Sequence, residues 1–225
     1  MDLTYYGQSC FSVTVNGKKL LFDPFITPNE LAAHIDINTI EADYILLSHG
    51  HSDHVADVEA IATRTGATII ASYEVATWFG NKGLKNHTMN TGGKWKFDFG
   101  TVKCVNAIHS SSMPDGSYGG NPLGFVITND ENNFYYSGDT ALTLDMQLVP
   151  MFADVDFCIL PIGDNFTMGI EDAAEAAKMV QCDTVIGVHY DTFGFIKIDH
   201  RKAMEYFSSK GIDLLLPGIG NTISI

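Results

Sequence analysis

Short runs of apolar and β-branched residues alternate with polar turns along the whole chain. The first three runs are Leu3–Tyr6, Cys10–Val15 and Lys19–Phe22. The pair Asn16-Gly17 between the second and third run is a typical two-residue hairpin turn. The N-terminal part is therefore predicted to form antiparallel strands.

From residue 44 onward, the pattern predicts strands that alternate with helices. Asp57–Thr65 has apolar residues at helical spacing and is followed by Gly66, a residue type that commonly ends helices. The same spacing predicts helices over Ile170–Val180 and Arg201–Ser209. Further strands are predicted at Tyr44–Leu47, Ala67–Ala71, Val102–Ile108, Leu123–Thr128, Asn133–Ser137, Val155–Leu160, Thr184–Val188 and Ile212–Leu216.

These elements predict a single domain over residues 1–225, because no linker, repeat or low-complexity segment divides the chain. Strand–helix alternation combined with hairpins indicates the α/β (α+β) class. There is too much predicted sheet for one small layer. We therefore expect a four-layer αββα sandwich, in which two mixed β-sheets pack face to face and are flanked by helices.

Composition excludes several partners. The net charge is −14 and only two arginines occur, which argues against a nucleic-acid partner, because such sites need clustered basic residues. No apolar run has the length of a membrane span and no secretion signal is visible, so we expect no membrane partner. The four cysteines are far apart and form no CxxC pair, which fits a reducing cytoplasm.

Candidate metal ligands gather in the stretch "SHGHSDH", directly after the predicted strand Tyr44–Leu47. The pattern HxHxDH consists of His49, His51, Asp53 and His54. Imidazole and carboxylate groups are good ligands for zinc, manganese and iron. A solvated polar loop is the alternative, but the stretch holds no Lys, Arg or Glu. Small Gly50 and Ser52 let the chain turn sharply, so that alternate side chains can face two ions.

Three more candidate ligands follow later strands. His109, Asp139 and His189 each stand where a strongly β-type run ends and a loop starts. Alone, each is more often an ordinary polar residue at a strand end. Together with HxHxDH they predict a metal site, and Asp139 could bridge two cations.

These motifs resemble those of the metallo-β-lactamase superfamily, over nearly the whole chain. The stretches "GQSCF" (Gly7–Phe11), "LLFDPF" (Leu20–Phe25), "PIGDNFTMG" (Pro161–Gly169) and "HYDTF" (His189–Phe193) are similar to its branch of small metal-dependent hydrolases, which includes the ascorbate-6-phosphate lactonase type. The resemblance implies a dinuclear site at one edge of an αββα sandwich. The branch commonly has His near the N-terminus where this chain has Gln8.

The resemblance also implies how the ligands divide. The first metal ion is then held by His49, His51 and His109. The second is held by Asp53, His54 and His189, and Asp139 bridges the two. The cofactors are two divalent ions, with Zn²⁺ favoured; Mn²⁺, Fe²⁺ and Ni²⁺ stay open because nitrogen/oxygen sites accept several metals.

A hydrolase is the function that such a site favours. Two dications lower the pKa of a shared water, and the resulting hydroxide can attack an ester, lactone, amide or phosphoester bond of a small-molecule substrate. Asp53 and Asp139 are the expected catalytic carboxylates, Asp53 by orienting the hydroxide.

Three rival functions use the same site. The alternative enzyme is a phosphodiesterase or nuclease of this fold, which the acidic composition disfavours. A redox di-iron protein typically has Glu where His51 stands, and a protein without catalysis is disfavoured because all seven ligand positions are filled. The sequence does not decide between a monomer and a homo-oligomer.

Residues around the ligands have weaker signals. Asp23 and Asp164 follow strands and are candidate acceptors for ligand histidines. By resemblance, Asn165, Thr167 and Met168 line the pocket. The glycine-rich segment Ser110–Asn121 is a candidate gating loop.

Basic residues and the remaining histidines have no assigned place in the cluster. Lys197 or Arg201 could contact a phosphorylated substrate. His34 (helix), His87 (loop) and His200 (helix start) are expected to be surface or capping residues.

Overall fold

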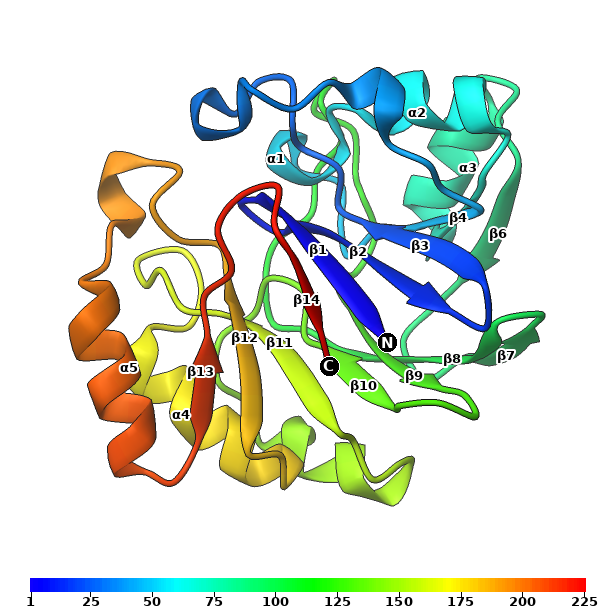
Figure 1. Cartoon of the computed structure of the whole chain (residues 1–225). Coiled ribbons are helices and arrows are strands. Elements are labelled where there is room, and N and C mark those ends of the chain that lie inside the picture. Colours follow the sequence, from blue (N-terminus) through cyan, green and yellow to red (C-terminus); the bar gives the residue numbers. More distant parts are fainter.

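Two seven-stranded β-sheets pack face to face in the computed structural model, which describes residues 1–225 (Figure 1). In spatial order, the first sheet contains β14 (Thr222–Ser224), β1 (Asp2–Gly7), β2 (Cys10–Val15), β3 (Lys18–Phe22), β4 (Tyr44–Leu46), β5 (Thr68–Ser72) and β6 (Asn86–Met89). The second contains β13 (Asp213–Leu215), β12 (Thr184–Val188), β11 (Phe157–Pro161), β10 (Phe134–Tyr136), β9 (Leu123–Thr128), β8 (Gly100–Asn106) and β7 (Lys94–Phe97).

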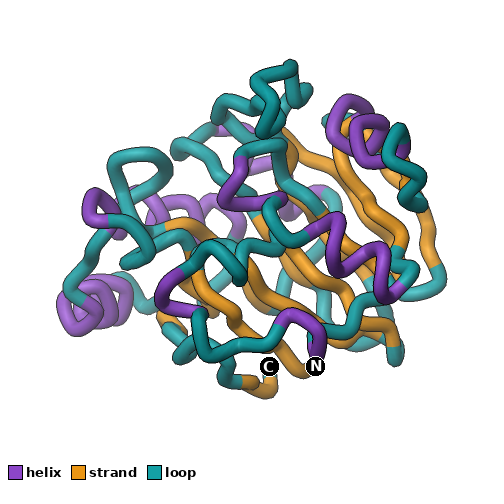
Figure 2. Tube along the Cα trace, turned by 90° about the horizontal axis from the view of Figure 1, so that it is seen from above, coloured by secondary structure: helices purple, strands orange, loops and turns teal.

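Helices lie on the outer faces of both sheets, so the predicted four-layer αββα sandwich is confirmed (Figure 2). The first sheet carries α1 (Ser52–Val55), α2 (Val58–Thr65) and α3 (Tyr73–Gly80), and the second carries α4 (Ile170–Val180) and α5 (His200–Ser209). Four 3₁₀ helices complete the chain: η1 (Glu30–Ala32), η2 (Ile37–Thr39), η3 (Leu144–Met151) and η4 (Gly194–Ile196).

Each sheet is mixed in the same way. Strands β1 to β3 pair antiparallel, whereas β3 to β6 pair parallel. In the second sheet, β7 to β10 pair antiparallel and β10 to β13 pair parallel. The parallel strands therefore all end at the same edge of their sheet, and the polar residues that follow them meet there.

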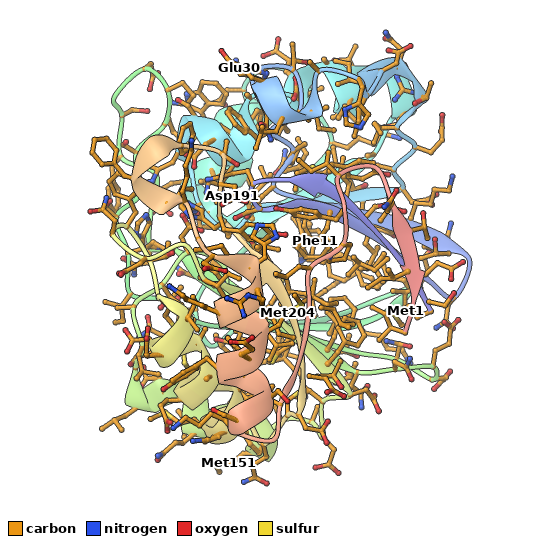
Figure 3. All side chains as sticks on the ribbon, turned by 60° about the vertical axis from the view of Figure 1, so that its left-hand side comes forward. Met1, Phe11, Glu30, Met151, Asp191 and Met204 are labelled. Atoms are coloured by element: carbon orange, nitrogen blue, oxygen red, sulfur yellow. The ribbon has the colours of Figure 1, made fainter.

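The core lies between the sheets and is rich in aromatic rings. Phe22 on β3 stacks on Phe11 of β2, with ring centroids 4.5 Å apart. The Phe22 ring also forms edge-to-face pairs with three rings of the opposite sheet, at centroid distances of 5.6 to 6.4 Å: Phe125, Phe134 and Tyr136. Edge-to-face pairs of this kind add to the stabilisation from area burial. Phe11 therefore lies well inside the molecule (Figure 3).

The parallel strands are buried on both faces. On β4, Leu46 belongs to the core between the sheets, whereas Ile45 packs beneath the helices of the first sheet. Ile70 and Ile69 on β5 divide in the same way. This explains why these strands read as continuous apolar runs rather than alternating ones.

The predicted strands and helices are confirmed, with shifts of one or two residues at several ends. Asn16 and Gly17 have the positive φ angles, 47° and 73°, that a two-residue hairpin needs. The sequence reading did not include α3, β6, β7 and β14. Strands β6 and β7 are edge strands, of which β6 (NHTM) is mostly polar and β7 (KWKF) alternates Lys with aromatic residues. His87, expected in a loop, lies on β6.

The two ends of the chain meet at the edge of the first sheet. Strand β14 pairs with β1, so that the two ends lie close together (Figure 1), and the Met1 amino group donates a hydrogen bond to the Ile225 carbonyl at 2.9 Å. None of the helices is both long and apolar enough to span a bilayer.

Phe22→Ala should lower the free energy of unfolding by about 3–5 kcal/mol, because it removes a fully buried ring that contacts both sheets. Phe195→Ala is the matched control: its ring is 78% exposed, and we expect a change within about 0.5 kcal/mol. Denaturant titration followed by circular dichroism measures both. Equal losses in the two variants would contradict the described core.

Candidate metal centre

The structure brings all seven predicted ligand side chains together at the edge where the parallel strands end. His49 follows β4, and Asp53 and His54 lie on the short helix α1, for which His51 is the N-cap residue. From the second sheet, His109 follows β8, Asp139 follows β10 and His189 directly follows β12.

Asp139 lies at the centre of the cluster. Its Oδ2 atom is 3.0 Å from His189 Nε2 and 3.2 Å from His54 Nε2. The same oxygen is 3.9 Å from His49 Nε2 and 3.7 Å from His109 Nε2. One carboxylate oxygen therefore faces imidazole nitrogens from both sheets.

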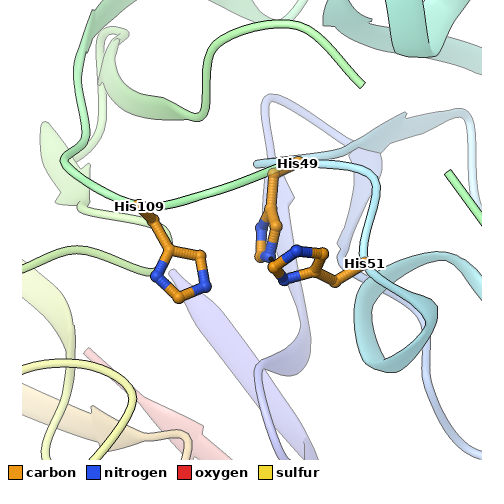
Figure 4. Close-up of side chains that lie close together, drawn as sticks. All are labelled: His49, His51 and His109. Carbon is orange, nitrogen blue, oxygen red and sulfur yellow. Dashed lines mark hydrogen bonds between the residues drawn. The ribbon is translucent and has the colours of Figure 1, made fainter. Parts of the chain in front are cut away.

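The donor atoms form three overlapping groups, and within each group they lie within 4.8 Å of one another. The groups are His49, His51 and His109; His49, His54 and Asp139; and Asp53, His54 and His189. In the first group His49 Nε2 is 2.9 Å from His51 Nδ1, and the His109 ring faces both (Figure 4). The first and third groups match the ligand division that the resemblance implied.

Asp23, which directly follows β3, forms a hydrogen bond to one histidine of the cluster. It is fully buried and accepts hydrogen bonds from His54 Nδ1 at 2.9 Å and from the Tyr136 hydroxyl at 2.5 Å. Ser48 donates to it twice, from its backbone N–H at 2.8 Å and from its hydroxyl at 2.6 Å. With Nδ1–H engaged by Asp23, the neutral form of His54 would direct its Nε2 lone pair toward Asp139.

Ser48 extends this control to His49. Because its hydroxyl donates to Asp23, it accepts from His49 Nδ1–H at 2.9 Å. The lone pair of His49 Nε2 then faces the cluster. Asp23 thus sets the tautomer of one histidine directly and of a second through Ser48.

Gln8 contacts two members of the cluster from the β1–β2 turn. Its side-chain Nε2 donates to Asp53 Oδ2 at 2.9 Å, and its carbonyl accepts from the His189 backbone N–H at 2.8 Å. Gln8, Asp23 and His189 all have positive φ angles, of 52°, 41° and 56°. Non-glycine residues adopt this conformation rarely, and such residues concentrate at functional sites. The sequence does not assign a role to Gln8. In the structure, Gln8 holds the Asp53 carboxylate and the His189 backbone in place.

The carboxylates favour positive charge at the cluster. Burial alone would lower the pKa of His54, but Asp139, Asp53 and Asp23 outweigh it and raise that pKa well above its usual value. Burial also acts to lower the pKa of His189, but Asp139 and Asp53 outweigh it and raise that pKa to about 9. Burial opposes ionisation of Asp139 too, yet His189 and His54 hold its pKa well below the ordinary range.

The other imidazoles respond in the opposite direction. Burial, followed by the neighbouring His54, lowers the pKa of His49 and His51. Burial is also the main reason that the pKa of His109 is lowered, although Asp139 opposes the shift. Neutral imidazoles beside ionised carboxylates are the forms in which these groups bind metals.

Three atoms of the cluster residues lack a hydrogen-bond partner within the chain, and one of them is His189 Nδ1. The other two, His54 Nε2 and Asp139 Oδ1, are also buried and form no hydrogen bond. A buried polar atom without a partner costs about 1–3 kcal/mol, and a cation between these atoms would remove that cost. The residues present therefore fit divalent metal ions, with nitrogen and oxygen donors and no thiolate.

Comparison with known proteins agrees with this geometry. The model of the β-lactamase superfamily domain matches residues 2–189. A metal-dependent hydrolase of Flavobacterium johnsoniae is 54% identical over 225 residues, which is 100% of both chains. The chain belongs to the β-lactamase superfamily.

Two solved structures share the fold of this chain. A metallo hydrolase from the archaeon Ignicoccus hospitalis superposes with a TM-score of 0.89 at 32% identity, covering 99% of this chain and 97% of that one. An isothiocyanate hydrolase from Delia radicum gut bacteria superposes at 0.80 with 20% identity, covering 100% and 99%, and shows the fold alone. The narrower resemblance to the ascorbate-6-phosphate lactonase type stays a prediction.

Several other predicted site residues lie outside the cluster. Asp164 is exposed and accepts only from the N–H of Asn165, not from a ligand histidine. Met168 is fully buried in the core, and neither Asn165 nor Thr167 lines the cavity beside the cluster. Positive φ angles at Asp164 and Asn165, 62° and 59°, turn the chain so that Phe166 lines the cavity instead.

No residue of the segment Ser110–Asn121 lines the cavity, although Ser110 Oγ lies 3.4 Å from His51 Nε2, and its gating role stays a prediction. Gly119 accepts hydrogen bonds from Ser72 and Ser111, and Trp78 of α3 donates to Asp115. These contacts hold most of the segment against the first sheet and α3.

The remaining histidines and basic residues are also separate from the cluster. His34 is exposed just after η1 rather than in a longer helix, and His200 begins α5 with a 2.6 Å hydrogen bond to Asp191. Arg201 pairs with Glu205 on α5, and neither Arg201 nor Lys197 lines the cavity.

Asp23→Asn should weaken metal binding about 10- to 100-fold, because an amide presents its NH₂ group to donors that now meet a carboxylate. Competition with a chromophoric chelator measures the affinity. Asp57→Asn is the matched control, since Asp57 is also buried but accepts only from the backbone N–H groups of Ile26 and Thr27. It should lower stability without changing metal affinity; equal affinity losses would assign Asp23 a merely structural role.

Proposed function

We propose that the chain is a dinuclear metal-dependent hydrolase that cleaves an ester, lactone, amide or phosphoester bond of a small molecule. The observation that carries the proposal is the position of Asp139, whose Oδ2 atom lies within 3.9 Å of imidazole nitrogens from four histidines. His49, His51 and His109 would hold one cation. Asp53, His54 and His189 would hold the other, with Asp139 shared between them.

Bound divalent ions supply Lewis-acid chemistry, in which a water pKa falls toward neutrality and the oxygen of the scissile bond is polarised. Asp139 contributes negative charge at the point where the two ligand groups meet. Asp53 is the group that can orient water and accept a proton at Oδ2, because its side chain is 24% exposed and lines the cavity. Gln8 keeps that oxygen in place through its 2.9 Å hydrogen bond.

No cysteine thiol competes with water for this role. All four cysteines are buried and unpaired, and burial raises the pKa of Cys10 and Cys104. Free thiols also support the proposal of a cytoplasmic location. Zn²⁺ is the ion that the donor set favours, although Mn²⁺, Fe²⁺ and Ni²⁺ suit the same ligands.

A small molecule is favoured over a nucleic acid as the substrate. The cavity beside the cluster has a volume of about 830 Å³, which lies in the range of small-molecule sites. No Lys or Arg lines it, and the chain carries a net charge of −14. A nuclease would need cationic groups that follow the phosphate backbone.

Elemental analysis of the purified protein should find about two divalent ions per chain. Asp139→Asn should retain about one or none, because a neutral amide is a much weaker ligand to two cations than the shared carboxylate. Dialysis against a chelator should abolish hydrolysis of a panel of lactones, esters, amides and phosphoesters, and Zn²⁺ or Mn²⁺ should restore it. Full activity in protein shown to be metal-free would end the proposal.

Asp53→Ala should lower kcat about 10²- to 10⁴-fold, the usual contribution of a group that handles the transferred proton. Asp164→Asn is the control, because the Asp164 side chain is exposed and forms no hydrogen bond or ion pair with the clustered residues. Circular dichroism must show that both variants are folded. Unchanged kcat in folded Asp53→Ala would remove Asp53 from the mechanism.

A further inference from the structure

The cavity beside the cluster has two walls of different chemistry. One wall is the cluster itself, through His51, Asp53, His109, Asp139 and His189. The other comes from three loop segments, with Pro28, Asn29, Glu30, Leu31, Phe166, Thr192, Phe193, Gly194 and Phe195. A substrate with its reactive bond at the cluster must place the rest of its structure against this second wall.

Three exposed phenylalanines dominate the second wall. Phe166, Phe193 and Phe195 are 52%, 37% and 78% exposed, although rings of this size are normally buried. Phe166 and Phe195 meet edge to face with centroids 6.4 Å apart, and Phe193 leans on Phe25 at 6.3 Å. Exposed rings gathered around one opening mark a surface that receives an apolar group.

Charge on the second wall has one sign only. Glu30, the first residue of η1, is exposed and forms no salt bridge, and it is the only charged residue of this wall. Figure 3 shows Glu30 on η1, at the end of the molecule that also holds the loop after Asp191. The cations expected for a phosphorylated substrate, Lys197 and Arg201, do not line the cavity. An anionic group on the part of the tail that contacts this wall would therefore meet the Glu30 carboxylate and no cationic side chain.

We propose that the substrate carries an aromatic or branched-alkyl tail that is neutral or positively charged, such as an arylalkyl amine derivative, and not an anionic tail. Phe166 and Phe195 bind the apolar part, and Glu30 selects the positive charge. This inference rests on the proposed function, because it takes the cluster as the place where the reactive bond sits.

Three probes without a hydrolysable bond separate the two ideas: 2-phenylethylamine, 2-phenylethanol and 2-phenylethanesulfonate. Titration calorimetry with the metal-loaded protein gives their dissociation constants. The amine should bind most tightly and the sulfonate most weakly. Glu30→Gln should weaken binding of the amine about two- to fivefold, the size of an exposed charge pair, and leave the alcohol unchanged.

The aromatic wall is tested with the same probes. Phe195→Ala and Phe166→Ala should each weaken binding of both the amine and the alcohol about two- to tenfold, the value of an aromatic pair. Phe152→Ala is the control, because Phe152 is 42% exposed but lies outside this cavity. Its variant should bind all three probes as the natural protein does.

Two results would overturn the inference: a sulfonate that binds as tightly as the amine, or equal losses in Phe152→Ala and Phe195→Ala. Neither result depends on turnover. If the probes bind as expected while no lactone, ester, amide or phosphoester is hydrolysed, the proposed function fails and the tail preference stands. If hydrolysis occurs but the probes do not discriminate, only the tail preference fails.

Discussion

The site depends on one buried carboxylate, that of Asp23. An ionised group without water is stable only when hydrogen bonds replace its hydration, and Asp23 receives four. The donors belong to Ser48, His54 and Tyr136, so the same group ties the end of β4, helix α1 and strand β10 together. Because Tyr136 also packs on Phe22, the hydrogen bonds that orient the clustered histidines connect directly to the aromatic core between the sheets.

Two residues outside the cluster, Asp23 and Gln8, orient different members of it. Asp23 orients His54 directly and His49 through Ser48. Gln8 orients Asp53 with its side chain and fixes the backbone of His189 with its carbonyl. The contacts of Gln8 cross between the sheets, since Gln8 lies between β1 and β2 whereas His189 follows β12. A shift of one sheet against the other would therefore change both ligand groups together.

The sequence predicted what periodicity and strand-end position determine, namely the layers, most strands and the seven clustered residues. It did not predict α3, because "YEVATWFG" combines strong strand formers with apolar residues on nearly every side. Asp23 and Asp164 had the same signal, an Asp just after a strand, yet only Asp23 faces a ligand. Side-chain direction there depends on local φ, which is positive at both residues, and on which neighbours are packed behind them.

The clustered polar residues and the apolar second wall of the cavity come from different parts of the fold. The charged groups stand directly at strand ends or on α1, where the core fixes them, whereas the apolar wall comes from loops. Two of these loops begin close to strand ends that position the site: Glu30 lies seven residues after Asp23, which follows β3, and Phe195 lies six after His189, which follows β12. A change in the loops can therefore alter the tail that binds without disturbing Asp139, but a change at Gln8 or Asp23 acts on the metal ligands first and on every substrate alike.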